Sequence, residues 1–186
     1  MRPEGAAYRQ ALRRAYQGEV MGEAGFTEAA RHVGHPTRKA KLRTLAELEA
    51  LTADSLRPAA RRLQLMHIGS ATARRTGLRL AHQRIRWRWS RFVADLEKMA
   101  AVYAQRYVDL AARALDADRT ALQWLAEHEL ALQEFARRES SGAAGDSLER
   151  VQRLMRTAGG VARSGSVRAH CLRRASASRA AATRPA

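Results

Sequence analysis

The stretch Tyr16–Phe26, with the sequence YQGEVMGEAGF, decides how the fold is interpreted. Apolar and small residues recur around it at steps of three and four residues, which is typical of the buried face of an amphipathic helix. Glu19 falls in the middle of that face, whereas Glu23 falls on its flank. Because an unpaired buried charge costs several kcal/mol, an inward Glu19 requires a partner. We expect Glu23 to be more exposed and to pair with an arginine.

Two other helical segments place a carboxylate in the same way. The pattern over 37–63 has Glu49 near the midpoint of its apolar face, and the pattern over 119–139 has Glu129 there, beside His128. An alternative is that these acids lie at the rim or pair with an arginine. The arginines that could do so are Arg13, Arg14, Arg43 and Arg106.

The periodicity predicts an all-α fold, and the composition, rich in alanine, leucine, arginine and glutamate, supports it. We expect an antiparallel four-helix bundle over residues 1–158, with a long crossover between the second and third helices and a short fifth helix. The expected helices cover 4–33, 37–63, 89–115, 119–139 and 147–157, and the crossover holds a short helix over 78–87. Residues 159–186 are basic, nearly free of large apolar side chains, and expected to be a disordered tail.

The third helix has no acid on its apolar face. Tyr103 and Tyr107 lie on that face, and the nearest carboxylate is Glu97 on its flank. Buried tyrosine hydroxyls need hydrogen-bond partners. Glu97 could bridge to a metal only if this helix were rotated.

Carboxylates that converge from several helices repel one another, and a divalent metal ion removes both the repulsion and the cost of burial. Four-helix bundles build metal centres from glutamates and Glu-x-x-His pairs on facing helices. Oxygen-rich sites of this kind suit iron or manganese. The candidate ligands are Glu19, Glu49, Glu129, His128 and Glu97.

Three segments resemble the ferritin-like superfamily, in particular its rubrerythrin-type domains. They are AYQGEVMGEAGF, LAELEALTADSL and LAEHELALQEFARRE. The resemblance implies that Glu19 and Glu49 are ligands and that His128 and Glu129 belong to the site. It departs from the family at Thr52, which replaces a histidine, and at Leu125, which replaces a glutamate. It therefore implies an incomplete carboxylate site, with an oxidase or peroxide-reducing role inherited from the family.

The net charge of +16 favours an anionic partner and gives an alternative function, that of a basic, non-catalytic nucleic-acid-binding protein. The segment 55–94 has ten arginines and no acid, and interleaves them with Trp87, Trp89 and Phe92. Such a pattern can bind a nucleic-acid backbone and stack bases, or lie on an anionic membrane surface. The alternative is a solvated crossover whose tryptophans pack under the bundle.

The remaining features narrow the class of protein. A single cysteine, Cys171, excludes a disulfide within the chain and a cysteine-based zinc cluster. No apolar run is long enough to span a membrane, and the N-terminus lacks a secretory signal, so we expect a cytoplasmic protein. Candidate partners are a second copy, forming a homodimer, and nucleic acid bound by Arg-rich segments. Four histidines are expected at the surface: His32, His35, His67 and His82.

Overall fold

The computed structural model describes residues 3–66 and 69–157. Within these residues the regular secondary structure is entirely helical, which confirms the all-α prediction. The tail predicted over 159–186 lies outside the described residues. The helices are α1 (Pro3–His32), α2 (Pro36–Arg62), α3 (Ser70–Arg84), α4 (Trp89–Ala112), α5 (Asp116–Ser140) and a 3-10 turn η1 (Ala144–Asp146), followed by a helix over 149–157.

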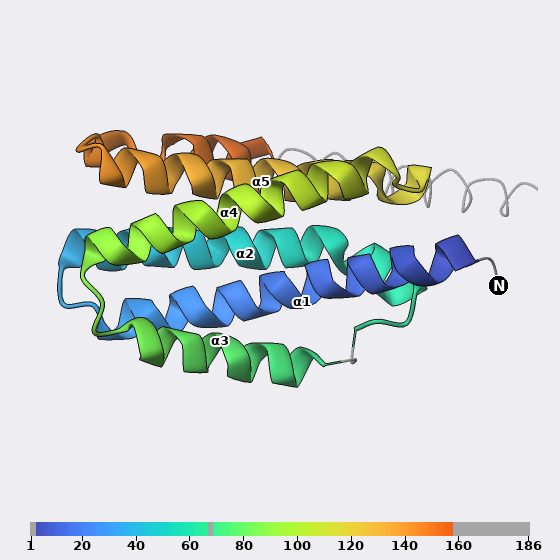
Figure 1. The fold of residues 1–186 in the computed structure, drawn as a ribbon, viewed down its shortest axis with the longest axis horizontal. Coiled ribbons are helices and arrows are strands. Elements are labelled where there is room, and N and C mark those ends of the chain that lie inside the picture. Colours follow the sequence, from blue (N-terminus) through green and yellow to red (C-terminus); the bar gives the residue numbers. More distant parts are fainter. Residues whose placement is uncertain (1–2, 67–68, 158–186) are drawn as a thin grey trace, which may run out of the picture.

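Helices α1, α2, α4 and α5 lie side by side along one direction, and α3 packs on the outside of α1 (Figure 1). Short connections at 33–35 and 113–115 join α1 to α2 and α4 to α5, so each pair runs in opposite directions. The last residue of α2 and the first residue of α4 lie at opposite ends of the molecule. Helix α3 carries it back between them, so that α2 and α4 run in the same direction.

Two apolar clusters form the core, and each draws on α1, α2, α4 and α5. The first contains Leu12, Leu56, Leu110 and Leu122, and the second contains Phe26, Leu45, Val93 and Phe135. All are buried, and burying one such side chain contributes about 1.5–3 kcal/mol. Because a cluster lies towards each end, the middle of the four helices is left for other side chains.

The crossover helix is longer than predicted and begins earlier, at Ser70 instead of Leu78. The sequence GSATARRTG suggested a break, because glycine and small polar residues disfavour helices. The structure gives Gly77 a packing role. A Cβ atom there would lie 2.2 Å from the carbonyl oxygen of Met21 and 3.1 Å from the backbone nitrogen of Gly25. The missing side chain lets the backbones of α1 and α3 approach closely.

Two further details refine the expected boundaries. Helix α2 continues through Pro58 to Arg62, and the chain leaves it at Gln64, whose φ of 56° is left-handed. The short last helix begins at 149, two residues later than predicted.

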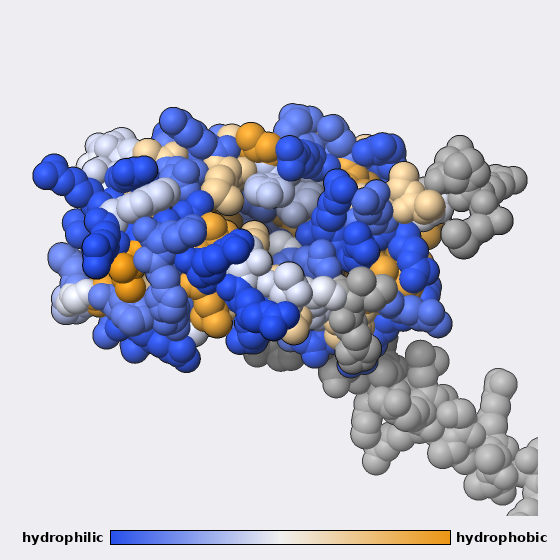
Figure 2. All heavy atoms as spheres, turned by 60° about the horizontal axis from the view of Figure 1, so that its bottom comes forward, coloured by the Kyte–Doolittle hydropathy of each residue, from blue (hydrophilic) through white to orange (hydrophobic). Residues whose placement is uncertain are grey.

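The surface is mainly polar. Hydrophilic residues cover most of the face in Figure 2, which looks towards the α3 side, and apolar residues form separate small areas on it. Among the described helices, none combines the length and the apolar character needed to cross a membrane.

Candidate metal centre

A polar cluster lies midway along the helices, between the two apolar clusters. Glu19 comes from α1, Glu49 from α2, and His128 from α5, and their exposed fractions are 2%, 6% and 0%. Each offers one ligand atom, and the three atoms lie within 4.8 Å of one another. The structure therefore brings together three of the residues predicted from the sequence, each from a different helix.

The imidazole of His128 is fixed by Thr52. Nδ1 lies 2.9 Å from Oγ1 of Thr52, and that hydroxyl donates its own hydrogen to the carbonyl of Leu48, also at 2.9 Å. The indole Nε1 of Trp124 donates to the same Oγ1 at 3.1 Å. Since the only hydrogen of the hydroxyl goes to Leu48, Oγ1 accepts from Nδ1, and this network assigns a proton to Nδ1.

The other imidazole nitrogen, Nε2, faces Glu49 without a hydrogen bond, and Glu19 lies beside Nδ1. Nε2 of His128 lies 3.5 Å from Oε1 of Glu49. Oε2 of Glu19 lies 3.0 Å from Nδ1. Nε2 of His128 and Oε2 of Glu19 are both buried and lack a hydrogen-bond partner. Buried polar atoms in proteins are nearly always paired, so this pair of atoms needs an explanation.

The electrostatics of the cluster favour bound protons. Burial raises the pKa of Glu49, the charge of Glu19 adds to the effect, and His128 opposes it. Burial opposes protonation of His128, but the charges of Glu19 and Glu49 outweigh burial and raise its pKa well above the ordinary value. Without a metal, the cluster limits its charge by holding protons.

Two other predicted ligands are not members of this group. Glu129 is 8% exposed, and burial together with the charges of Glu19 and Glu49 raises its pKa, although His128 opposes the shift. Its carboxylate does not belong to the three-atom group. Glu97 is partly exposed on α4 and also lies outside the group.

No arginine or lysine in the described part of the chain forms an ion pair with Glu19, Glu49 or Glu129. The arginine-pairing alternative is therefore wrong for these three acids. The separate prediction that Glu23 is more exposed and pairs with an arginine is confirmed. Its side chain is 35% exposed and lies 4.0 Å from Arg74.

A cleft of about 1100 Å³ leads to the cluster between α1, α3 and α4. Glu19, Glu49 and Glu129 line its inner part, and Tyr107 stands on the α4 side, where an acid would complete a four-helix site. Burial and the nearby acids raise the pKa of the Tyr107 hydroxyl well above its ordinary value. The cleft therefore extends inward as far as the buried carboxylates.

Two glycines of α1 shape the inner cleft. A Cβ atom on Gly22 would lie 2.3 Å from Oε2 of Glu49, so the carboxylate occupies the space a side chain would fill. A Cβ atom on Gly18 would lie 3.5 Å from the hydroxyl of Tyr107, an ordinary contact.

Sequence reasoning missed the roles of Thr52, Trp124 and Gly22. The sequence identifies Thr52 only as the residue that replaces a histidine. One signal was present, because a threonine on the buried face of a helix needs a hydrogen-bond partner. Nothing local in the sequence could have shown that the partner is a histidine 76 residues away.

No family model matches this chain, and neither does any curated protein or solved structure. The interpretation of the centre rests on its geometry.

Proposed function

We propose that this protein is a ferritin-like helical bundle that binds one divalent iron or manganese ion between Glu19, Glu49 and His128, with a redox role. In this proposal α1, α2, α4 and α5 are the four bundle helices and α3 is the crossover. The direction of the helices supports it, because a crossover between two parallel helices is a feature of ferritin-like folds.

One observation carries the proposal. Three buried ligands converge from three helices, no lysine or arginine pairs with the acids in the described residues, and Oε2 of Glu19 and Nε2 of His128 lack hydrogen bonds. A protein that needed only stability would gain from apolar residues at these positions. A cation would satisfy both atoms and offset the repulsion between the carboxylates.

The ligand set supports one ion better than two. Paired-metal centres of this fold class use a Glu-x-x-His pair on each of two helices. Here Thr52 binds Nδ1 of His128 instead of a metal, and Leu125 is a fully buried core residue. With one imidazole and two or three carboxylates, the donors suit iron or manganese.

Side chains near the proposed ion would orient its histidine ligand and exchange protons. Thr52 and Trp124 hold the imidazole so that Nε2 points to Glu49. The carboxylate of Glu129, near the group, could hold or release a proton at the inner end of the cleft. A bound iron or manganese ion would supply one-electron redox chemistry, such as reaction with oxygen or peroxide. Metal uptake would release protons, so affinity should rise with pH.

Metal analysis tests the proposal. Untagged protein, purified without chelator and reconstituted with Fe²⁺ or Mn²⁺, should retain roughly one ion per chain after desalting. The double variant Glu19→Gln, Glu49→Gln should retain about one ion per chain fewer than the wild type, and Glu97→Gln should bind like the wild type. Equal retention by the double variant would exclude this centre.

The nucleic-acid alternative has less support, because the tryptophans it needs are engaged within the protein. Trp87 packs against the guanidinium groups of Arg84 and Arg91. Trp89 stacks on Phe92 and donates its Nε1 hydrogen to Glu139. Retention on heparin or DNA that falls steeply with salt, in protein without iron or manganese, would favour the alternative.

A further inference from the structure

A second group of metal-ligand side chains lies where α3 meets α1, away from the central cluster. Glu28 and His32 are one helical turn apart on α1, and His82 comes from α3. Nε2 of His32 and Nε2 of His82 both lie 2.9 Å from the same oxygen, Oε1 of Glu28. The sequence predicted both histidines to be at the surface, and their side chains are 43% and 59% exposed.

The arrangement leaves one carboxylate oxygen facing two imidazoles. Arg31 donates to the other oxygen, Oε2, at 2.9 Å and so fixes the orientation of the Glu28 carboxylate. The rings of His32 and His82 meet edge to face, with centroids 5.6 Å apart. The three ligand atoms lie within 4.8 Å of one another.

These separations are close to those in a metal site. In a tetrahedral zinc site with bonds near 2.0–2.1 Å, ligand atoms lie about 3.3 Å apart, so small side-chain movements would admit an ion. Two imidazoles and one carboxylate form a ligand set typical of Zn²⁺ or another first-row transition ion, with solvent in the remaining position. Partial exposure gives the ion a route from solvent.

We propose that Glu28, His32 and His82 form a second, surface-accessible site for a divalent transition metal ion, which fastens the crossover helix α3 to α1. Residues of α3, including Gly77 and Leu80, line the cleft that leads to the central cluster. An ion at this site holds one wall of that cleft in place. The site does not depend on the proposed central ion, since it shares no residue with it.

Zinc titration of untagged, chelator-treated protein tests the inference. The variants are His82→Ala and His32→Ala, and the matched control is His35→Ala, which removes an exposed histidine just beyond α1. We expect wild type and control to bind one more equivalent of Zn²⁺ than either test variant, or to bind it at least about tenfold more tightly. Zinc bound elsewhere in the chain contributes equally to every isotherm, so the difference between variants reports only this site.

Hydrogen–deuterium exchange gives an independent measurement. Zn²⁺ should slow exchange of the α3 amides in wild type and in the control, but not in His82→Ala. An unchanged zinc isotherm in His82→Ala, or zinc binding without protection of α3 in the wild type, would overturn the inference. The double variant Glu19→Gln, Glu49→Gln should keep the α3 effect, which separates this result from failure of the central site.

Discussion

The middle and the ends of the helices bury carboxylates in opposite ways. Near one end, Glu139 accepts hydrogen bonds from Lys41, from Ser147 at 2.5 Å and from Trp89 at 2.7 Å. Burial opposes ionisation of Glu139, but these donors outweigh it and hold its pKa below the ordinary value. In the middle, the pKa values of Glu49 and Glu129 are raised.

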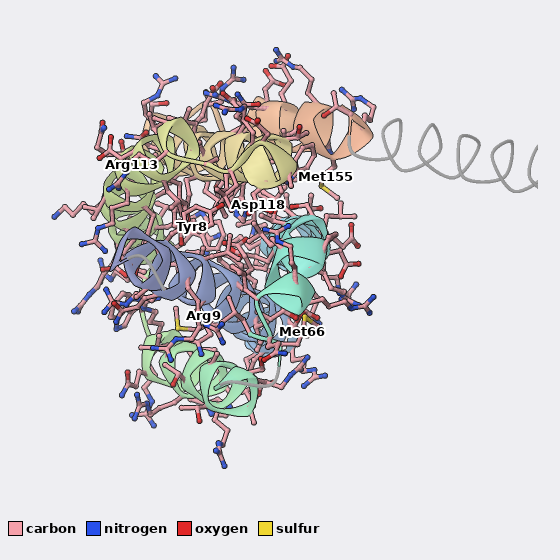
Figure 3. All side chains as sticks on the ribbon, turned by 90° about the vertical axis from the view of Figure 1, so that its right-hand side faces the viewer. Tyr8, Arg9, Met66, Arg113, Asp118 and Met155 are labelled. Carbon is pink, nitrogen blue, oxygen red and sulfur yellow. The ribbon has the colours of Figure 1, made fainter. Side chains whose placement is uncertain are left out.

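The other end repeats the paired arrangement. Asp118 is 1% exposed and accepts hydrogen bonds from Tyr8 at 2.7 Å and from Arg62 at 2.5 Å. Figure 3, which looks along the helices, shows Tyr8 and Asp118 facing each other. Burial and the bond to Asp118 raise the pKa of Tyr8 to about 12.

Although the chain has 34 lysines and arginines, it places one beside each buried acid at the ends and none beside those in the middle, within the described residues. The central acids therefore do not reflect a shortage of cationic side chains. Removing the cation beside an acid at the ends would leave a buried charge uncompensated and is therefore costly, whereas the central acids have no lysine or arginine partner to lose.

The largest expected effect comes from removing the cation of a paired acid. Lys41→Met leaves Glu139 buried without its charged partner, and such a loss costs about 3–5 kcal/mol. Urea denaturation should show this decrease in the free energy of unfolding. Lys98→Met, at an exposed position on α4, should change it by less than about 0.5 kcal/mol. Similar results for the two variants would remove the contrast between middle and ends.

Removing a central acid should increase the free energy of unfolding, whereas Lys41→Met decreases it. Glu129→Gln should stabilise the metal-free protein by about 2 kcal/mol near pH 8. The folded-state pKa of Glu129 lies above that of the unfolded chain, so its destabilising effect grows as pH rises above the unfolded value and is absent below it. Denaturation in EDTA at several pH values measures this. A gain that does not increase with pH, or a loss of stability, would contradict the assignment.

Thr52→Val tests the support of His128. Without the hydroxyl, Nδ1 loses its acceptor, and the affinity for Fe²⁺ or Mn²⁺ should fall about tenfold, in the range seen when a ligand's supporting hydrogen bond is removed. Thr44→Val is a matched control, because the Thr44 hydroxyl also donates to the carbonyl four residues earlier on α2. Equal affinities in the two variants would show that Thr52 does not position the imidazole.

The smallest expected effects on metal binding and stability come from substitutions at two glycines of α1. Gly22→Ala displaces the carboxylate of Glu49 and should weaken metal binding severalfold, whereas Gly18→Ala should leave binding unchanged. Alanine favours a helix interior over glycine by up to about 1 kcal/mol, so Gly18→Ala should also stabilise the protein slightly. Isothermal titration and thermal unfolding measure the two effects. Weaker metal binding by the Gly18 variant than by the Gly22 variant would contradict the conclusion that the missing side chain of Gly22 makes room for the Glu49 carboxylate.

The sequence predicted what local periodicity can determine. The inward direction of Glu19, Glu49 and His128 follows from steps of three and four residues, as does the all-α class. The crossover helix was misjudged because Gly77 acts through contact with a distant helix, which periodicity does not report. The contacts of Thr52 with His128, and of His82 with Glu28, were missed for the same reason: both join residues more than 50 positions apart.

The order of the helices divides the candidate ligands between two halves of the chain. The first antiparallel pair, α1 and α2, carries Glu19 and Glu49, and the second pair, α4 and α5, carries His128 and Glu129. A chain cut between α3 and α4 would give two fragments, neither with a complete set of donors. An ion bound at the centre would therefore contact both halves, and its binding would increase the affinity of the two fragments for each other.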